Sequence, residues 1–91
     1  MILCKVIGSV WATRKDEALT GVKLMIVRRI DAAGDEGAEQ FVAADFVGAG
    51  VGENVIVATG SSARNACQNK TAPIYATIIG IVDAVELQES K

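Results

Sequence analysis

Apolar residues alternate with polar or small residues along most of this chain, which is the pattern of half-buried β-strands. Between Ile2 and Thr13 one face carries small apolar residues, while the other face mixes large apolar and polar side chains. The same reading predicts four further strands, over Gly21–Ile30, Gln40–Phe46, Val55–Thr59 and Thr77–Leu87. The pattern therefore predicts an all-β chain.

Polar segments separate these strands. Arg14–Glu17 is predicted to be a solvated loop, and Asp31–Glu39, which contains two glycines, is predicted to be a hairpin loop. Ser61 or Ser62 is placed to cap a short helical turn over Ala63–Gln68. The polar run that follows ends at Pro73, which cannot donate to a central strand, and it is predicted to be a loop.

Two strands have a glycine near their middle, Gly8 in the first and Gly80 in the last. A glycine there favours a bulge or a sharp bend, as a strand needs when it serves two sheets of a small barrel. Five strands and one short helical segment predict a small, closed or nearly closed, antiparallel barrel of the five-stranded OB-like type. A length of 91 residues fits one domain over residues 1–91.

Composition and charge argue against some classes of partner and location. The formal charge is −2, with nine basic and eleven acidic residues spread along the chain, which argues against a nucleic-acid partner. No apolar run approaches the roughly 20 residues of a membrane-spanning helix. The segment Met1–Lys5 lacks the order of a signal peptide, so a cytosolic location is predicted.

Histidine is absent, and Cys4 and Cys67 are the only cysteines. This removes the commonest general base and makes a structural zinc site improbable. Both cysteines are interpreted as reduced thiols, with Cys4 as a small buried hydrophobe in its strand.

The segment Asp45–Glu53 holds three glycines within five residues and leads through an apolar strand into Gly60–Arg64. Glycines in this density indicate backbone that a side chain would forbid, or backbone pressed against something else. The partner could be a phosphate, another strand or a neighbouring subunit. The functional interpretations are phosphate binding, assembly and, from the barrel alone, single-stranded nucleic-acid binding.

The two binding alternatives find little support. A dinucleotide loop needs G-x-G-x-x-G spacing and a following helix, whereas here the third glycine comes one residue early and a strand follows. An OB-type nucleic-acid surface needs aromatic platforms along a basic groove, but the four aromatic residues are scattered. A nucleic-acid or small-ligand binding module therefore remains only as the alternative function, supported by fold analogy alone.

Assembly is the third interpretation, because glycines let two backbones approach and so apolar a small barrel has more hydrophobic surface than one core hides. In a symmetric ring each subunit buries one patch against a different patch of the next. Arg64 and Glu53 are then candidate charge partners, with plain solvation of both as the alternative.

Five motifs stand along the chain at characteristic separations: Lys5–Thr13, Gly21–Leu24, Asp45–Glu53, Gly60–Arg64 and Ile79–Asp83. Together, and in this order, they resemble the EutN/CcmL family, the pentamer-forming vertex proteins of bacterial microcompartments, over essentially the whole chain. The resemblance implies a structural shell protein, present in the cytoplasm as part of a microcompartment shell. It also implies a homopentamer that contacts hexameric shell proteins, with no catalytic residue, cofactor or metal, and no nucleic-acid or membrane partner.

The candidate residues for a subunit interface or an axial pore come from the two glycine-containing motifs. They are Gly48, Ala49, Gly50, Gly52, Glu53, Gly60, Ser61, Ser62 and Arg64. One position departs from the family pattern: Tyr75 stands where the family commonly has an aspartate. Its ring either changes a subunit contact or packs at a strand start with its hydroxyl in water.

Overall fold

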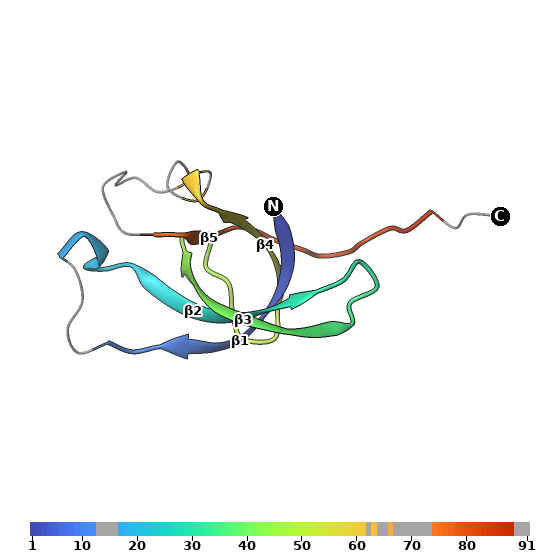
Figure 1. Cartoon of the computed structure of the whole chain (residues 1–91), viewed down its shortest axis with the longest axis horizontal. Helices are drawn as coiled ribbons and strands as arrows, with labels where there is room; N and C mark the ends of the chain where they lie inside the picture. Colours follow the sequence, from blue (N-terminus) through green and yellow to red (C-terminus); the bar gives the residue numbers. More distant parts are fainter. Residues whose placement is uncertain (13–16, 62, 64–65, 67–73, 89–91) are drawn as a thin grey trace.

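The computed structural model describes residues 1–12, 17–61, 63, 66 and 74–88. Its elements are β1 (Ile2–Val10), η1 (Glu17–Leu19), β2 (Lys23–Ile30), β3 (Glu36–Asp45), β4 (Asn54–Thr59) and β5 (Ala76–Ile81). The strands close a barrel in the order β1-β2-β3-β5-β4 (Figure 1). The predicted five-stranded OB-like barrel is thus confirmed.

One strand pair differs from the predicted antiparallel arrangement. β3 and β5 run parallel, with Ala44 opposite Thr77 and Asp45 opposite Ile78, whereas the other four pairs are antiparallel. The parallel pair arises because β5 enters the sheet between β3 and β4 instead of following β4 at an edge. Parallel strands need a crossover, and the path from β3 to β5 runs through the loop 46–53 and β4, which pairs with β1 and with β5.

β1 is the strand at which the barrel closes. It pairs with β2 from Cys4 to Val10 and with β4 from Ile2 to Lys5, and its register against β2 shifts between Val6 and Gly8. This confirms the irregularity predicted from the mid-strand glycine. The pairing of β4 with β5 shifts in the same way opposite Gly80.

The β2–β3 hairpin loop is shorter than predicted. β3 begins at Glu36, so the turn covers 31–35 and not Asp31–Glu39. The Asp31 carboxylate explains the difference, because its Oδ1 accepts hydrogen bonds from the backbone N–H groups of Ala33 and Asp35, both at 2.9 Å. An aspartate that closes its own turn leaves the following residues free to pair with β2.

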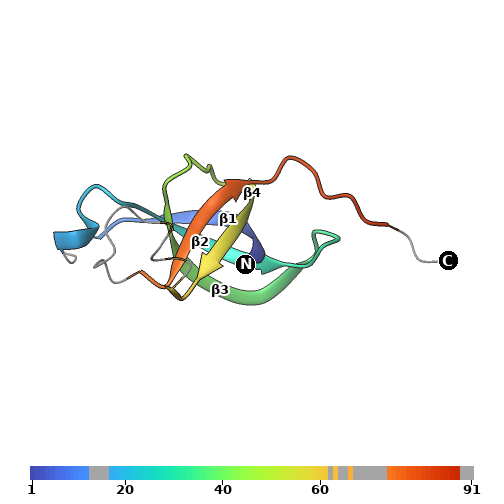
Figure 2. The same ribbon diagram turned by 90° about the horizontal axis from the view of Figure 1, so that it is seen from above.

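The last strand is also shorter than predicted, since β5 ends at Ile81 and not at Leu87. The Val82 N–H donates to the Asn54 carbonyl at 2.8 Å, and residues 82–88, here called the C-terminal arm, then leave the barrel (Figures 1 and 2). The alternating sequence of the arm is that of a strand, but the described part of its own subunit gives it no strand to pair with.

The predictions for two short connections can be compared with the structure only in part. The predicted loop Arg14–Glu17 lies outside the described residues except for Glu17, which begins the 3-10 turn η1. The predicted helical turn over Ala63–Gln68 lies largely outside them too, although Ser61 and Ala63 have helical backbone.

Two clusters of buried side chains stabilise the barrel. The larger cluster fills the interior with small and medium-sized residues: Cys4, Val6, Met25, Val27, Ala43, Ala49, Val55, Val57, Ala76 and Ile78. The smaller one joins Ala44, Ala63 and Ile74. Ala49 is the one member of the larger cluster that comes from a loop, so the glycine-rich segment is part of the core.

Cys4 is a free, fully buried thiol, as predicted. Burial raises its pKa from 9.0 to about 11, while the charge of Arg29 lowers the pKa and that of Glu39 raises it. The thiol is therefore neutral at physiological pH and behaves as an apolar core group. Cys67 lies outside the described residues.

Candidate functional site

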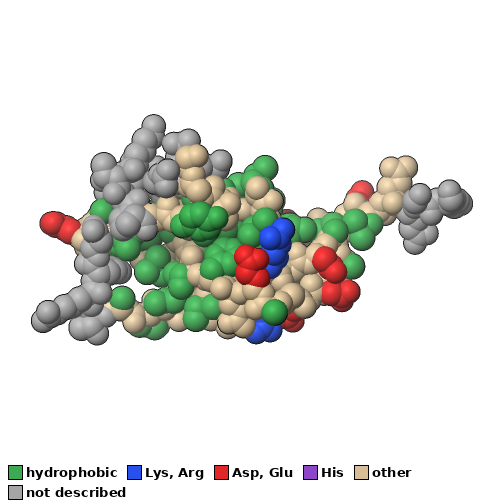
Figure 3. Space-filling model, viewed as in Figure 1, with side chains coloured by type: hydrophobic (Ala, Val, Ile, Leu, Met, Phe, Trp, Pro, Cys, Tyr) green, Lys and Arg blue, Asp and Glu red, His purple; other side chains and the backbone are tan. Residues whose placement is uncertain are grey.

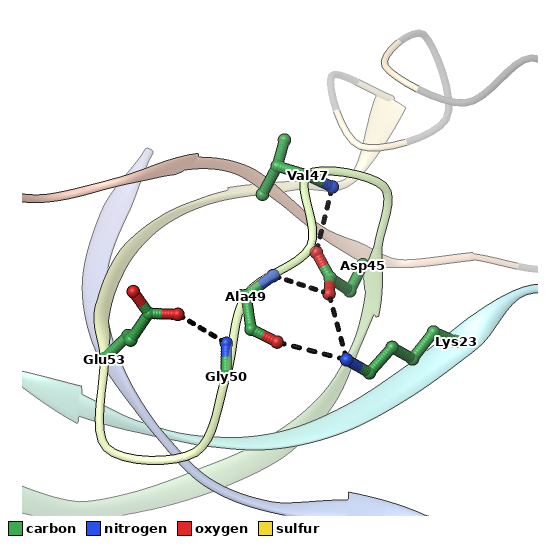
Figure 4. Close-up of polar contacts among 6 residues, drawn as sticks. All are labelled: Lys23, Asp45, Val47, Ala49, Gly50 and Glu53. Atoms are coloured by element: carbon green, nitrogen blue, oxygen red, sulfur yellow. Dashed lines mark hydrogen bonds and ion pairs between the residues drawn. The ribbon is translucent and has the colours of Figure 1, made fainter.

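The conformation of the glycine-rich loop depends on Asp45, the last residue of β3 (Figure 4). Its side chain is 1% exposed, and its two oxygens accept hydrogen bonds from the N–H groups of Val47 at 3.0 Å and Ala49 at 2.9 Å. Lys23 completes the arrangement, because its Nζ lies 3.2 Å from the Ala49 carbonyl oxygen and 3.9 Å from Asp45 Oδ2. We call this arrangement of Asp45, Lys23 and the backbone of Val47 and Ala49 the Asp45 clamp.

The other end of the loop is fastened to β1. The Gly52 N–H donates to the Val6 carbonyl at 2.8 Å, and the Val6 N–H donates to the Glu53 carbonyl at 2.9 Å. This exchange continues the β1–β4 ladder for one more step beyond Lys5 and Asn54. The loop therefore closes one end of the barrel and carries Ala49 into it.

Two positions of the loop require glycine because their backbone has a positive φ. Gly48 has a φ of 78° and Gly52 a φ of 94°. These values lie in the left-handed region, where a residue with a Cβ is strained. The density of glycine thus reflects sharp turns within one subunit at these two positions.

The loop is not a phosphate cradle. An anion site needs several free backbone N–H groups pointing at one place. Here most of these groups already donate to acceptors in the same subunit, namely those of Val47, Ala49, Gly50, Gly52 and Glu53. Glu53 contributes to this internal network, since its Oε1 accepts from the Gly50 N–H at 2.6 Å.

The second candidate segment, Gly60–Arg64, begins with a turn at the end of β4. Gly60 has a φ of 64°, its N–H donates to the Tyr75 carbonyl at 2.7 Å, and its carbonyl accepts from the Ala63 N–H at 3.1 Å. Ala63 is buried, and its carbonyl accepts from the Thr77 hydroxyl at 3.0 Å. Ser61 is exposed, whereas Ser62 and Arg64 lie outside the described residues.

Within one subunit the two candidate segments lie at opposite ends of β4. Glu53 directly precedes the strand and Gly60 directly follows it, so the six residues of β4 separate them, a span of roughly 20 Å. A contact between Glu53 and Gly60 or Ser61 would therefore have to join two subunits.

Sequence analysis missed the two side chains that position the loop. Asp45 was read only as the first residue of the motif and Lys23 only as part of a strand, yet together they fix the loop geometry. An available signal was the Asx pattern, in which an aspartate at a strand end bonds the backbone two residues on.

The described surface carries many exposed large apolar side chains. They are Met1, Trp11, Val42, Phe46, Val47, Val51, Tyr75, Ile79, Ile81, Val85 and Leu87. Trp11 is 94% exposed and Val51, on the glycine-rich loop, is 65% exposed. Such a share of exposed apolar side chains is unusual for a protein that functions as a monomer.

The described basic side chains do not form a free cationic groove. Arg28 and Lys5 both lie near Glu36, with N–O distances of 3.3 and 3.9 Å, and Arg29 lies 3.7 Å from Glu39. Among the described residues no helix is long and apolar enough to cross a membrane, and none of their His, Cys, Asp and Glu side chains gather as a metal site would require.

Comparison with known proteins decides the family. Residues 1–83 match the family model for "Ethanolamine utilisation protein EutN/carboxysome". The chain belongs to the EutN/CcmL family. The resemblance seen in the five sequence motifs is thereby confirmed.

Relatives and solved structures in this family are alike over nearly their whole length. The chain is 45% identical over 87 residues to the carboxysome shell vertex protein CcmL of Synechocystis sp., covering 96% of this chain and 87% of that protein. It is 48% identical over 87 residues to the microcompartment shell vertex protein GrpN of Rhodospirillum rubrum, covering 94% and 97%. The solved structure of the pentameric shell protein GrpN superposes with a TM-score of 0.89 at 45% identity, covering 97% of this chain and all of that one.

These relatives are named for a place in a shell and not for a reaction. The family assignment therefore accounts for a chain whose sequence offers neither a histidine nor a nucleophile with a base beside it. The likeness to these structures, at TM-scores near 0.9, also fixes the fold independently of the strand pattern.

Proposed function

We propose that this chain is a structural shell protein that assembles into a cyclic homopentamer and occupies the vertices of a polyhedral microcompartment shell. There it contacts hexameric shell proteins along its rim. A pentamer placed among hexamers introduces the curvature that closes a flat layer, so the role requires a rigid shape and specific edges. The protein is located in the cytoplasm, within the microcompartment shell.

The observation that carries the proposal is the combination of a rigid barrel with a large exposed apolar surface. The core is closed at the loop end by the Asp45 clamp, so the apolar side chains that remain outside cannot be buried by a rearrangement of that loop. A ring in which each subunit covers part of its neighbour buries such side chains without changing the barrel.

We infer that the outer face of the glycine-rich loop and the turn after β4 lie at the ring junction or line its axial opening. Gly48, Ala49, Gly50, Gly52, Glu53, Gly60, Ser61, Ser62 and Arg64 are the residues concerned. Of the described ones, Ala49 is buried inside the subunit, so it acts by shaping the loop and not by contact. Phe46, Val47 and Val51 form the apolar outer surface of this loop.

The mass of the assembly tests the oligomeric state. Light scattering coupled to gel filtration should give a mass of about five times the 9.5 kDa chain, unchanged over a hundredfold dilution. A monomer at every concentration would overturn the proposed pentamer.

A pair of matched variants tests the loop. Val51→Glu places a charge on the exposed outer surface of the loop, and a charge buried at an interface is costly. We expect the variant to remain folded but to dissociate at concentrations at least tenfold higher than the unchanged protein. Ala38→Glu, on the exposed start of β3, is the control and should leave the mass unchanged. Equal masses for both variants would exclude the loop from the interface.

Binding of nucleic acid, the alternative function, is tested by retention on single-stranded DNA at low salt. No retention is expected, because the described arginines are paired with acidic side chains.

A further inference from the structure

Among the described residues, the C-terminal arm pairs with no strand. It directly continues β5, and as an extended chain it places Val85 and Leu87 on one face. Val85 and Leu87 are 46% and 60% exposed, and the arm projects away from the barrel in both ribbon views (Figures 1 and 2). Unpaired backbone groups and exposed apolar side chains on one extended segment are the properties of a strand that pairs with another chain.

In the described part of the barrel, two strand edges lack a second partner over four residues or more. One is the end of β1 from Ile7 to Val10, which pairs only with β2 because β4 and the loop leave β1 at Val6. The other is the start of β3 from Glu36 to Val42, which also pairs only with β2 because β5 joins β3 at Ala44.

The side chains beside each edge discriminate between them. The arm exposes Val85 and Leu87, which favour an apolar surface. The start of β3 carries Glu36 and Glu39, both paired with basic side chains of the same subunit, and Figure 3 shows several acidic side chains at this end of the molecule. The hollow beside this edge is lined mainly by charged residues, so the β3 edge offers the arm little apolar surface.

The end of β1 has the complementary character. Beside it lies a hollow of about 310 Å³, here called the Trp11 groove, which is lined by Ser9, Val10, Trp11, Val22, Lys23 and Leu24. Its walls are mainly apolar, and the ammonium of Lys23, the charged residue among them, contacts the Ala49 carbonyl and Asp45 of the same subunit. The apolar side chains of the arm thus match an apolar groove.

We propose that the C-terminal arm of one subunit lies in the Trp11 groove of the next subunit and pairs with the free edge of its β1. Val85 and Leu87 pack against Trp11. The occupant of the groove is a second copy of this chain. The inference rests on the proposed ring and specifies which surfaces join its subunits.

The shape of the subunit makes this contact intermolecular. The Cα extent along the long axis is 52 Å, and the end of β1 and the arm lie toward opposite ends of that axis (Figure 1). The arm therefore cannot reach the groove of its own subunit. A contact between different patches at opposite ends of identical subunits is heterologous, which is the type that closes into a ring.

Disulfide trapping tests the pairing directly. Leu87→Cys and Ser9→Cys are combined in a Cys67→Ser background, since the buried and neutral thiol of Cys4 is protected from oxidation. Mild oxidation should give a ladder of covalent species up to the pentamer on a non-reducing gel. Each single variant, and the control pair Leu87→Cys with Glu36→Cys, should give no ladder beyond two chains.

A double variant tests the energetic contribution of the arm. Val85→Asp with Leu87→Asp leaves the barrel unchanged, because neither side chain belongs to the core. We expect its ring to dissociate at concentrations at least tenfold higher than those for Asp83→Asn with Glu86→Gln, which keeps the apolar contacts.

The outcomes separate the two proposals. If the unaltered chain is a pentamer but the Ser9 pair gives no ladder, or the Glu36 pair gives one, the arm contact is wrong and the ring stands. A pentamer whose mass and dilution behaviour do not respond to the double aspartate variant likewise overturns the arm contact. A monomeric unaltered chain overturns the ring itself and, with it, the arm contact.

Discussion

Removing the Asp45 carboxylate tests whether the glycine-rich loop is held by one side chain. The group is 1% exposed and accepts two backbone N–H groups at 2.9 and 3.0 Å. A hydrogen bond to a charged group is worth about 1.5–3 kcal/mol, and an unsatisfied buried donor costs about as much. Asp45→Ala should therefore lower the free energy of unfolding by roughly 3–5 kcal/mol.

Asp45→Asn is the more informative change because it preserves the shape of the side chain. An amide has one acceptor oxygen, and its NH₂ group would face one of the two N–H donors. We expect a loss of about 2–3 kcal/mol from this mismatch. Lys23→Met is the comparison, since it removes a half-exposed ammonium that lies 3.9 Å from the carboxylate and donates to the Ala49 carbonyl at 3.2 Å, and it should cost less, about 1–2 kcal/mol.

The assay is urea unfolding of all three proteins at one fixed concentration, because subunit association adds to apparent stability in a concentration-dependent way. Hydrogen exchange of the Val47 and Ala49 amides supplies a local measurement and should accelerate in Asp45→Asn. If Asp45→Asn is no less stable than Lys23→Met and these two amides remain protected, the carboxylate does not hold the loop.

Three further changes should have measurable effects. The unfolded state releases the Cys4 proton near pH 9.0 and the folded state near 11, so stability should fall as pH rises from 9 to 11, and Cys4→Ala should reduce that slope in pH-dependent urea unfolding. Gly52→Ala should cost about 1–2 kcal/mol because its φ is 94°, whereas Gly8→Ala, whose Cβ would meet Ile26 Cδ1 at an ordinary 3.7 Å, should cost less in the same experiment; the reverse order would contradict the strain argument. Thr77→Val should cost about 1–2 kcal/mol in thermal unfolding by removing the hydroxyl that donates to the Ala63 carbonyl, and an unchanged melting temperature would refute that role.

The sequence predicted the features that depend on local pattern. Alternation located all five strands, and Gly8 located the irregularity in β1 because a strand that bends around a barrel favours a residue without a side chain. The end of β5 could not be predicted in this way. Alternation continues to Leu87, but whether backbone forms a strand depends on a partner, and pairing is a property of the tertiary structure.

For the candidate site, the pattern predicted the segment but not the groups that hold its backbone. The glycine motif indicated close backbone packing, which is correct, but local pattern alone cannot distinguish packing against a ligand, a neighbouring subunit or the subunit itself. The choice depends on Val6, whose carbonyl accepts the Gly52 N–H, and on Asp45, whose carboxylate accepts the N–H groups of Val47 and Ala49. The interface roles of Glu53 and Ser61 stay predictions until the assembly is measured.

The position of β1 in the barrel has a consequence for how the chain reaches its native state. β1 must pair with β4, and Ile2 lies opposite Val57, so closure of the barrel joins residues 55 positions apart in the chain. During synthesis β1, β2 and β3 emerge first as a meander, and the edge of β1 stays unpaired until β4 has been made. Non-local pairing of this kind is slow, in the range of milliseconds to seconds for small β-proteins. The closing step, which also sets the Asp45 loop, is then the step that makes a subunit competent to join its neighbours.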